Sequence, residues 1–278
     1  MTRVHILASA LLAGCLLHTG IAAAGGVPAA PQRAAADAQA AAPPESPPIS
    51  WLAGYRFHLS AASLRADDPR FDWDAHFGGD IDLVDYGVGR LNLLADYGVT
   101  IGSEIRPIDP NQGAYHLAVS ASWRRGATEV QPVFDHVSRH LSDRSNERAV
   151  SWNAVGAAIT VRREHGALGA AVNARAARVV QAAFVDYTWR FGAGVDTVYR
   201  LSRRGALVAR GDVAPTLVDR AVAGRTTQVG INVEAGLRLH GPGAAIELFA
   251  GWERRVDPWP LERSAAGFPV VGFRFVSR

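Results

Sequence analysis

The sequence predicts an all-β protein, an antiparallel transmembrane β-barrel of about twelve strands. From residue 50 to the C-terminus, apolar residues recur at every second position, which is the period of a strand with two distinct faces. Tight glycine-containing turns alternate with longer polar loops, and charged residues occupy the parity opposite to the apolar one. We therefore expect apolar side chains to face lipid and charged ones to line the lumen. A soluble sandwich is the alternative, and the many charged inner positions favour the barrel.

The segment before the strands predicts export. Residues 1–24 combine Arg3, a short apolar run and a cluster of alanines, which is typical of a secretory signal peptide. The four residues that end at Cys15 also resemble a bacterial lipoprotein box, so lipidation of Cys15 is an alternative form of processing. Residues 25–49 are rich in Ala and Pro and predict a flexible linker. The barrel is expected over 50–278, in the bacterial outer membrane.

Alternation divides the barrel region into its expected strands. The run 184–201 keeps one parity throughout, which indicates a single long strand, because a two-residue hairpin would have shifted the parity. The expected strands are 51–61, 71–83, 90–102, 114–124, 128–140, 149–162, 166–176, 184–201, 206–214, 226–239, 244–253 and 267–276.

The first four strands show apolar odd positions and polar even positions, and the strand near 226–239 repeats this pattern. The apolar sets run from Trp51 to Leu59, Phe71 to Leu83, Leu91 to Ile101, Tyr115 to Trp123 and Val229 to Leu239. Trp51, Trp73, Trp123, Trp189 and Trp252 all lie on apolar parities and fit aromatic girdles at the two membrane interfaces.

The connections predict how the barrel is oriented. Tight turns near 124–126, 164–166, 203–205 and 241–243 alternate with polar loops near 62–70, 103–113, 141–148, 215–225 and 254–266. This rhythm predicts an even number of strands, with both ends of the barrel on the short-turn, periplasmic side. Phe273 and Phe275 resemble the aromatic C-terminal strand that barrel-assembly machinery recognises, so that machinery is an expected partner.

One strand, 128–140, carries a polar pair on its lipid-facing parity. Its odd positions include Glu129, Asp135 and Arg139, so the even positions His136 and Ser138 face lipid near the long loop that follows. Residues two apart on a strand share a face at roughly 7 Å, which suits a serine nucleophile and its histidine base.

A third group should orient the imidazole. On the following strand Asn153 leads the apolar parity and also faces lipid. If the hairpin closes around 142–147, antiparallel pairing places Asn153 beside His136. The same His-x-Ser pattern at His58 and Ser60 faces the lumen, where a polar pair needs no special explanation.

The constellation of His136-x-Ser138, a polar loop and Ser151-Trp152-Asn153 resembles outer-membrane phospholipase A, a twelve-stranded barrel with a His, Ser and Asn site on its outer wall. The resemblance implies that Ser138 is the nucleophile, His136 the general base and Asn153 the residue that orients it. Calcium and a homodimer are implied by this resemblance alone. No metal ligands carry over, and Arg139-His140 stands where that family has Asn-Gly.

Two further resemblances bear on the chemistry. Lipid A 3-O-deacylase also carries His-x-Ser on a barrel exterior, but its third member is a Glu, and no Glu lies on the right face here. The segments His136 to Asp143 and Arg65 to Phe71 resemble an uncharacterised family of bacterial outer-membrane proteins, which supports the fold and leaves the activity open.

Two classes of function therefore remain. The first is a lipid ester hydrolase of the phospholipase A kind, acting on membrane lipids. The second is a non-enzymatic barrel, with a structural, lipopolysaccharide-binding or narrow pore role, in which His136, Ser138, His140 and Asp143 are interfacial polar groups. A net charge of +3 gives no support to a nucleic-acid partner. The single cysteine excludes a disulfide framework and a cysteine-based zinc site.

Overall fold

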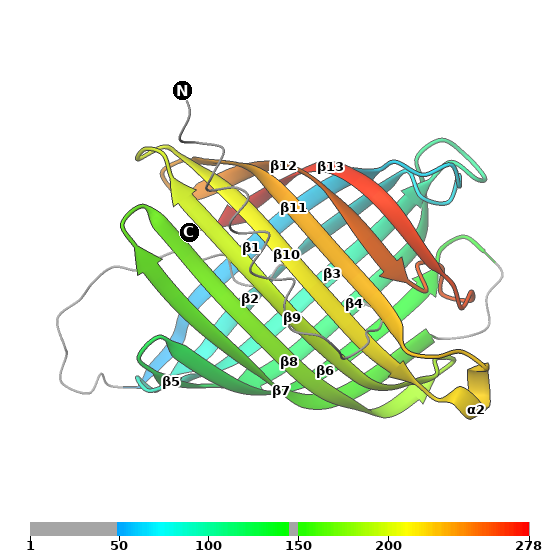
Figure 1. Cartoon of the computed structure of the whole chain (residues 1–278), viewed down its shortest axis with the longest axis horizontal. Coiled ribbons are helices and arrows are strands. Elements are labelled where there is room, and N and C mark those ends of the chain that lie inside the picture. The colour runs from blue at the N-terminus through cyan, green and yellow to red at the C-terminus, as the bar shows by residue number, and fades with distance from the viewer. Residues whose placement is uncertain (1–48, 145–149, 278) are drawn as a thin grey trace, which may run out of the picture.

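The computed structural model describes residues 49–144 and 150–277, which form a closed antiparallel barrel (Figure 1). The expected signal peptide, Cys15 and all of the expected linker except Ile49 lie outside the described residues. The strands are β1 (Ser50–Leu64), β2 (Trp73–Asp85), β3 (Arg90–Gly102), β4 (Asp109–Ala121), β5 (Trp123–Arg125), β6 (Thr128–Leu141), β7 (Val150–His165), β8 (Leu168–Ala183), β9 (Tyr187–Arg200), β10 (Gly205–Val218), β11 (Gln228–His240), β12 (Ala244–Val256) and β13 (Ala265–Ser277).

Every strand pairs with its neighbours in the chain except β4 and β5, which do not pair with each other, and two further pairings close the barrel. β1 pairs with β13, and β4 pairs with β6. The three-residue β5 continues the line of β4 beyond Ser122, so the barrel has twelve spanning strands, as the sequence predicted. A short helix, α2 (Arg220–Ala223), lies in the connection after β10. Among the described residues, no helix is both long and apolar enough to cross a membrane.

The predicted strands are confirmed, and several extend beyond their predicted ends. β4 begins at Asp109 and β10 runs to Val218, so parts of two expected loops are paired strand. These residues are polar or break the apolar alternation, so the sequence did not predict them as strand. The expected first residue of the second strand, Phe71, is not in a strand. Its ring is 3% exposed and packs among aromatic side chains at the loop end of the lumen.

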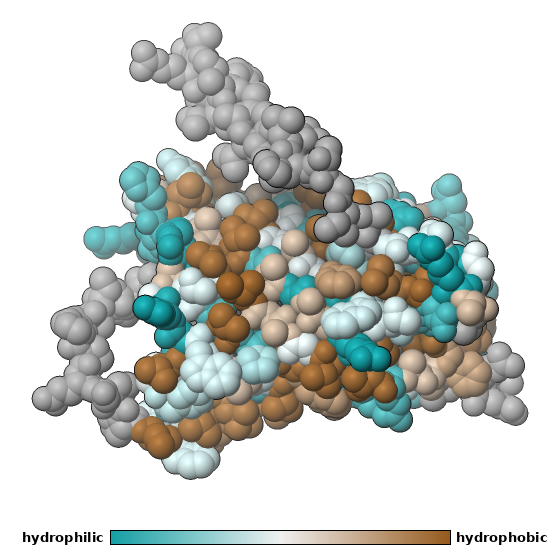
Figure 2. Space-filling model, turned by 60° about the horizontal axis from the view of Figure 1, so that its bottom comes forward, coloured by the Kyte–Doolittle hydropathy of each residue, from teal (hydrophilic) through white to brown (hydrophobic). Residues whose placement is uncertain are grey.

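The outer wall carries the apolar parity, as predicted (Figure 2). On β1 the side chains of Trp51, Tyr55 and Phe57 are all more than half exposed. The five predicted girdle tryptophans are exposed as well. Trp51 and Trp123 lie at the short-turn end of their strands, and Trp73, Trp189 and Trp252 lie near the loop end. They therefore mark the two edges of the apolar band.

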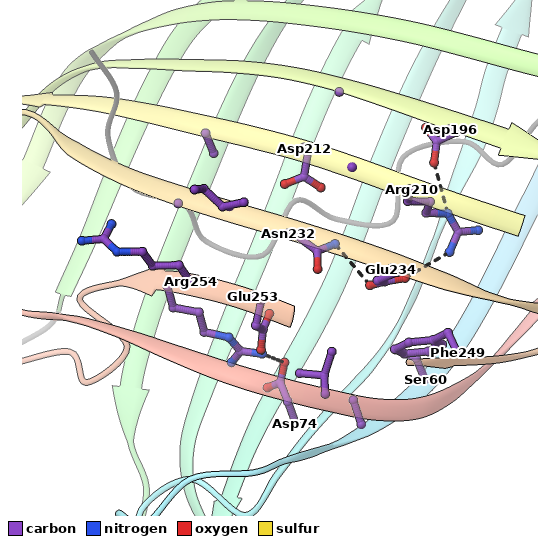
Figure 3. Close-up of a pocket in the computed structure, with 18 of the residues that line it drawn as sticks. Ser60, Asp74, Asp196, Arg210, Asp212, Asn232, Glu234, Phe249, Glu253 and Arg254 are labelled. Atoms are coloured by element: carbon purple, nitrogen blue, oxygen red, sulfur yellow. Dashed lines mark hydrogen bonds and ion pairs between the residues drawn. The ribbon is translucent and has the colours of Figure 1, made fainter. Parts of the chain in front are cut away.

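The lumen carries the charged parity in dense ion-pair networks. Glu247 is fully buried and accepts hydrogen bonds or ion pairs from Arg210, Arg238 and Arg274 at 2.6–3.1 Å. A cavity of about 120 Å³ lies beside this network and is lined by charged side chains from several strands (Figure 3). Many of these charged groups pair with one another inside the barrel, as expected for a narrow twelve-stranded lumen.

The loop end of the lumen is closed by the connection between β12 and β13. Arg139 reaches inward from β6, and its guanidinium donates to the carbonyl oxygens of Asp257 and Pro258 at 2.7 Å and to Gln112 Oε1 at 2.9 Å. Trp259 from the same connection packs edge-on against Phe71 with ring centroids 6.3 Å apart. This loop was expected to be polar and external. It turns inward because its aromatic and carbonyl groups find buried partners there.

Candidate functional site

The candidate site lies on the outer wall of the β6–β7 hairpin. His136, Ser138 and His140 occupy alternate positions of β6 and share its outward face. The register pairs His136 with Asn153 and Ser138 with Ser151. The side chains of His136, Ser138 and Asn153 are half-buried, whereas His140 is exposed. The expected pairing of His136 with Asn153 is therefore present, near the loop end of the barrel.

Asn153 connects His136 to a third strand. The Nδ1 atom of His136 lies 2.7 Å from Asn153 Oδ1, and Asn153 Nδ2 donates to Gln181 Oε1 on β8 at 2.8 Å. An amide oxygen only accepts hydrogen bonds, so Nδ1 of His136 is the donor in this pair. Its Nε2 is then the unprotonated nitrogen of the neutral ring and is free to accept a proton.

The hydroxyl of Ser138 contacts the other histidine of the face. Its Oγ lies 2.7 Å from Nε2 of His140. The sequence predicted a contact with His136, and it predicted His140 only as an interfacial polar group. Both rings lie two residues from Ser138 on the same face, and rotation about the serine χ1 turns the hydroxyl toward either one. The ring of His140 in turn packs edge-on against Tyr115, with centroids 5.9 Å apart.

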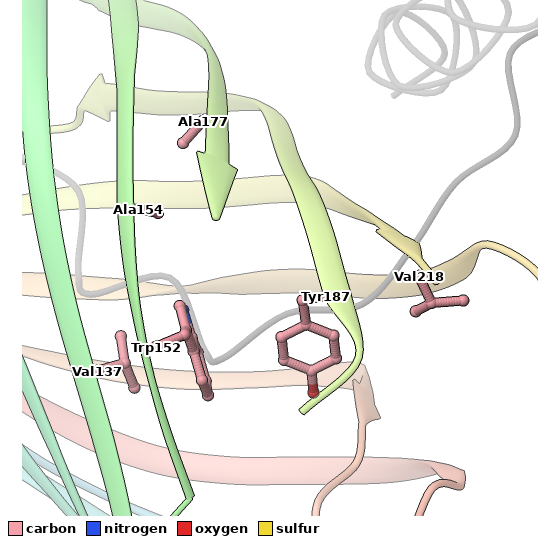
Figure 4. Close-up of a cluster of buried hydrophobic side chains, with 6 residues drawn as sticks. All are labelled: Val137, Trp152, Ala154, Ala177, Tyr187 and Val218. Carbon is pink, nitrogen blue, oxygen red and sulfur yellow. The ribbon is translucent and has the colours of Figure 1, made fainter. Parts of the chain in front are cut away.

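The site has a rigid backing inside the barrel. Val137 and Trp152 alternate with the site residues along β6 and β7, and both side chains are 1% exposed. They belong to a buried cluster with Ala154, Ala177, Tyr187 and Val218 (Figure 4). The rings of Trp152 and Tyr187 meet edge-on with centroids 5.2 Å apart. Close packing on the lumen side fixes the backbone from which the outward side chains project.

The His-x-Ser segment on the first strand has a structural partner in the lumen. His58 points into the lumen, where its Nε2 lies 2.7 Å from Asp96 Oδ1. His76 and His116 also face lumenal carboxylates, at 2.9 Å from Asp96 and Asp135 respectively. The contact of His58 agrees with the prediction that a polar pair in the lumen needs no special explanation, and His76 and His116 have the same structural role.

The described residues do not provide an evident metal site. Within 49–144 and 150–277, no group of three or more His, Cys, Asp or Glu side chains is arranged to hold a metal ion. The residues present therefore do not fit a calcium site built from a carboxylate cluster.

Two outward-facing residues of this region were not predicted from the sequence. Gln181 lies beyond the predicted end of its strand, and Arg178 lies on the outer face of the same extension of β8. The only sequence signal for them is that polar residues follow an alanine-rich strand toward its loop end. Such a signal does not reveal which face they occupy.

Comparison with known proteins bears on the fold. No family model matches the chain, and no curated protein matches it in sequence. Among solved structures, LpxR from Salmonella typhimurium superposes with a TM-score of 0.50 and 9% identity, covering 80% of this chain and 99% of that one. The calcium-bound dimer of the outer membrane phospholipase OMPLA from Salmonella typhi superposes with a TM-score of 0.51 and 12% identity, covering 80% of this chain and 90% of that one.

Both of these structures are outer-membrane β-barrels. Identities of this size show a shared fold and carry no further information about activity. The chain therefore has the architecture of an outer-membrane β-barrel, which supports its expected location in the outer membrane.

Proposed function

We propose that this outer-membrane barrel hydrolyses acyl esters of membrane lipids at the outward face of β6 and β7. The observation that carries the proposal is the hydrogen-bonded pair of His136 and Asn153, two residues along the strand from Ser138, on a wall that meets lipid. A serine, a histidine and an orienting amide are the parts that acyl transfer needs. Their position at the loop end puts them where lipid esters lie in a bilayer.

Each residue has one role in the proposed reaction. Ser138 turns toward His136, whose Nε2 takes the hydroxyl proton as Oγ attacks the ester carbonyl carbon. The ester C–O bond then breaks, and the imidazolium returns the proton to the departing alcohol. Water, deprotonated by the same nitrogen, cleaves the acyl-serine and releases the fatty acid. The Oδ1 atom of Asn153 accepts a hydrogen bond from Nδ1–H of His136 throughout and keeps Nε2 aimed at the serine.

The outward placement of the pair supports an enzymatic role over a merely interfacial one. Placing a polar side chain on the lipid face costs almost no free energy of folding close to the interface and more toward the middle of the bilayer. His136 and Asn153 nevertheless form a directed hydrogen bond with each other. Dimerisation and a calcium requirement are outcomes to be measured.

The test incubates the refolded full-length chain with mixed outer-membrane lipids, with and without calcium, and analyses the extracted lipids by mass spectrometry. Wild type should release fatty acid and lysolipid, and Ser138→Ala, His136→Ala and Asn153→Ala should lose most of this activity. Ser60→Ala is the matched control, because it removes the serine of a His-x-Ser segment that faces the lumen. Unchanged lipids from protein with heat-modifiable gel mobility would refute the proposal and favour a non-enzymatic barrel.

His140→Ala identifies the base. If His136 is the base, removing His140 frees the Ser138 hydroxyl and leaves activity within a few-fold of wild type. If activity instead disappears in His140→Ala and survives in His136→Ala, the contact seen in the structure is the catalytic one and the assignment of His136 is wrong.

A further inference from the structure

A bulge in β8 turns Gln181 toward the candidate site. Asn153 pairs with Gln181, but the next residue, Ala154, pairs with Val179, so Val180 is left without a partner on β7. The extra residue shifts the parity of the strand. Gln181 is therefore exposed on the outer wall, on the same face as Arg178 two strand positions earlier. Bulges commonly re-aim a side chain beside an active site.

The orientation of the Asn153 amide is coupled to that of Gln181. An amide has a donor end and an acceptor end, and the Gln181 Oε1 atom occupies the donor end at 2.8 Å. The Asn153 oxygen must then face His136, 2.7 Å away. If the amide were reversed, its NH₂ group would face Nδ1 of His136, and the hydrogen of the neutral ring would move to Nε2. A ring in that form has no lone pair at Nε2, the nitrogen that would accept a proton from Ser138.

We propose that Gln181 is a positioning residue, which fixes the amide of Asn153 and through it the tautomer of His136. Its catalytic consequence rests on the proposed hydrolase function, whereas the tautomer itself does not. Residues at position 181 with opposite hydrogen-bonding sense should therefore give opposite tautomers of His136.

The experiment compares Gln181→Glu, which keeps an acceptor, with Gln181→Lys, which offers only donors. The control is Val180→Lys, which places the same charge on the adjacent exposed bulge residue. Side-chain ¹⁵N shifts of His136 in the refolded full-length chain report the tautomer. We expect hydrogen on Nδ1 in wild type, Gln181→Glu and Val180→Lys, and on Nε2 in Gln181→Lys. The kcat of Gln181→Lys should fall on the order of a hundredfold with KM little changed.

Hydrogen on Nδ1 in Gln181→Lys, or on Nε2 in wild type, would overturn the inference. The tautomer is read without turnover, so a wild-type chain that hydrolyses no lipid refutes the proposed function and leaves this result standing.

A different observation concerns Arg178, an exposed arginine on the lipid face of β8. It lies between Val155 on β7 and Trp189 on β9, both of which face outward. Within the part of the chain that the structure describes, its side chain has no hydrogen bond, ion pair or ring contact. A guanidinium on this face is unfavourable in hydrocarbon and is stabilised where it reaches an anion at the interface.

The register places Arg178 at the level of the candidate site. Residues paired across neighbouring strands form a row that runs from Phe134 on β6 through Val155 and Arg178 to Trp189 on β9. The row approaches the loop end from β6 to β9, because Phe134 is midway along β6 and Trp189 lies near the loop end of β9. Strands tilted about 40° and spaced about 4.8 Å make this row rise about 3 Å per strand. The Cα of Arg178 is then about 4 Å below that of Ser138 in height and about 16 Å from it.

We infer that Arg178 binds the phosphate of the acylated lipid whose ester reaches Ser138. A lipid phosphate lies nearer to water than its ester, so the arginine side chain extends toward the loop end of the barrel, and this extension and the lipid backbone between phosphate and ester together span the gap. Guanidinium matches phosphate in a bidentate geometry that a compact ammonium group does not reproduce. Glycerophospholipids and phosphorylated acyl-glucosamines both offer this phosphate, and diacylglycerol offers the ester without it.

The test measures lipid binding by native mass spectrometry in the Ser138→Ala background, so that hydrolysis plays no part. The probes are phosphatidylglycerol, a phosphorylated acyl-glucosamine and diacylglycerol. Arg178→Gln should raise the Kd for one or both phosphate-bearing probes about tenfold and leave diacylglycerol unchanged. Arg163→Gln, at the short-turn end of β7, is the matched control.

The probe that responds to Arg178→Gln identifies the source of the phosphate. Equal binding of both phosphate-bearing probes to the parent and to Arg178→Gln would overturn the inference. Binding that depends on Arg178 would stand even if wild type proved to hydrolyse nothing.

Discussion

Replacing Glu247 by Gln should destabilise the barrel strongly although the two side chains have the same shape. The carboxylate is fully buried among three arginines, each within 3.1 Å. Charge centres about 4 Å apart attract by about 4 kcal/mol each at an effective dielectric constant near 20, and desolvation offsets much of that sum. Without the carboxylate, the three buried guanidinium groups lose their shared negative charge, and the free energy of unfolding should fall by about 3–5 kcal/mol.

The assay is urea unfolding of the full-length chain in lipid vesicles, followed by tryptophan fluorescence. Glu164→Gln is the control, because Glu164 lies 3.7 Å from Arg200 and both side chains are at least 40% exposed; its loss should cost less than about 0.5 kcal/mol. Adding Arg274→Gln to Glu247→Gln should recover about 1 kcal/mol or more by removing the unmatched charge. A Glu247→Gln barrel within 1 kcal/mol of wild type would refute the reasoning.

Three further predictions concern the core, the lumen and a loop. Trp152→Ala should lower the free energy of unfolding by about 3–5 kcal/mol in the same assay, because it leaves a cavity in the buried cluster behind the site. Planar-bilayer recordings should show no steady open channel in wild type, and Arg139→Ala, which releases the connection that closes the lumen, should raise conductance. The hydrogen bond from Arg70 holds the pKa of Asp68 below its usual value. Its stabilisation is therefore present above about pH 4 and lost at lower pH, so proteolysis of loop 65–72 should increase on acidification in wild type and not in Asp68→Asn.

Within the apolar band, the face of a strand residue was predictable wherever the alternation is unbroken, because a residue's parity then determines whether it faces lipid or the lumen. That is why the placement of His136 beside Asn153 followed from parity and an antiparallel hairpin. The girdle tryptophans followed from the same rule. Strand ends were less predictable, because paired extensions above the apolar band, such as the start of β4 at Asp109, have no apolar alternation to reveal them.

The remaining features depend on tertiary contacts that leave no periodic signal. The hydroxyl of Ser138 meets His140 through a choice of rotamer, which sequence spacing does not fix. Gln181 faces lipid only because one residue bulges out of β8. Phe71 and Trp259 pack inside because a loop folds back into the lumen, where each ring is the other's partner.

The outward placement of Ser138 determines how the proposed enzyme meets its substrate. A site on the wall needs no channel, since lipid arrives by lateral diffusion within the leaflet. The relevant concentration is then the mole fraction of substrate lipid in the membrane surface. Diluting the vesicles in buffer should leave the rate per barrel unchanged, whereas adding inert detergent or ether lipid at constant volume should slow it in proportion. Surface dilution would thus be the natural kinetic variable for this protein.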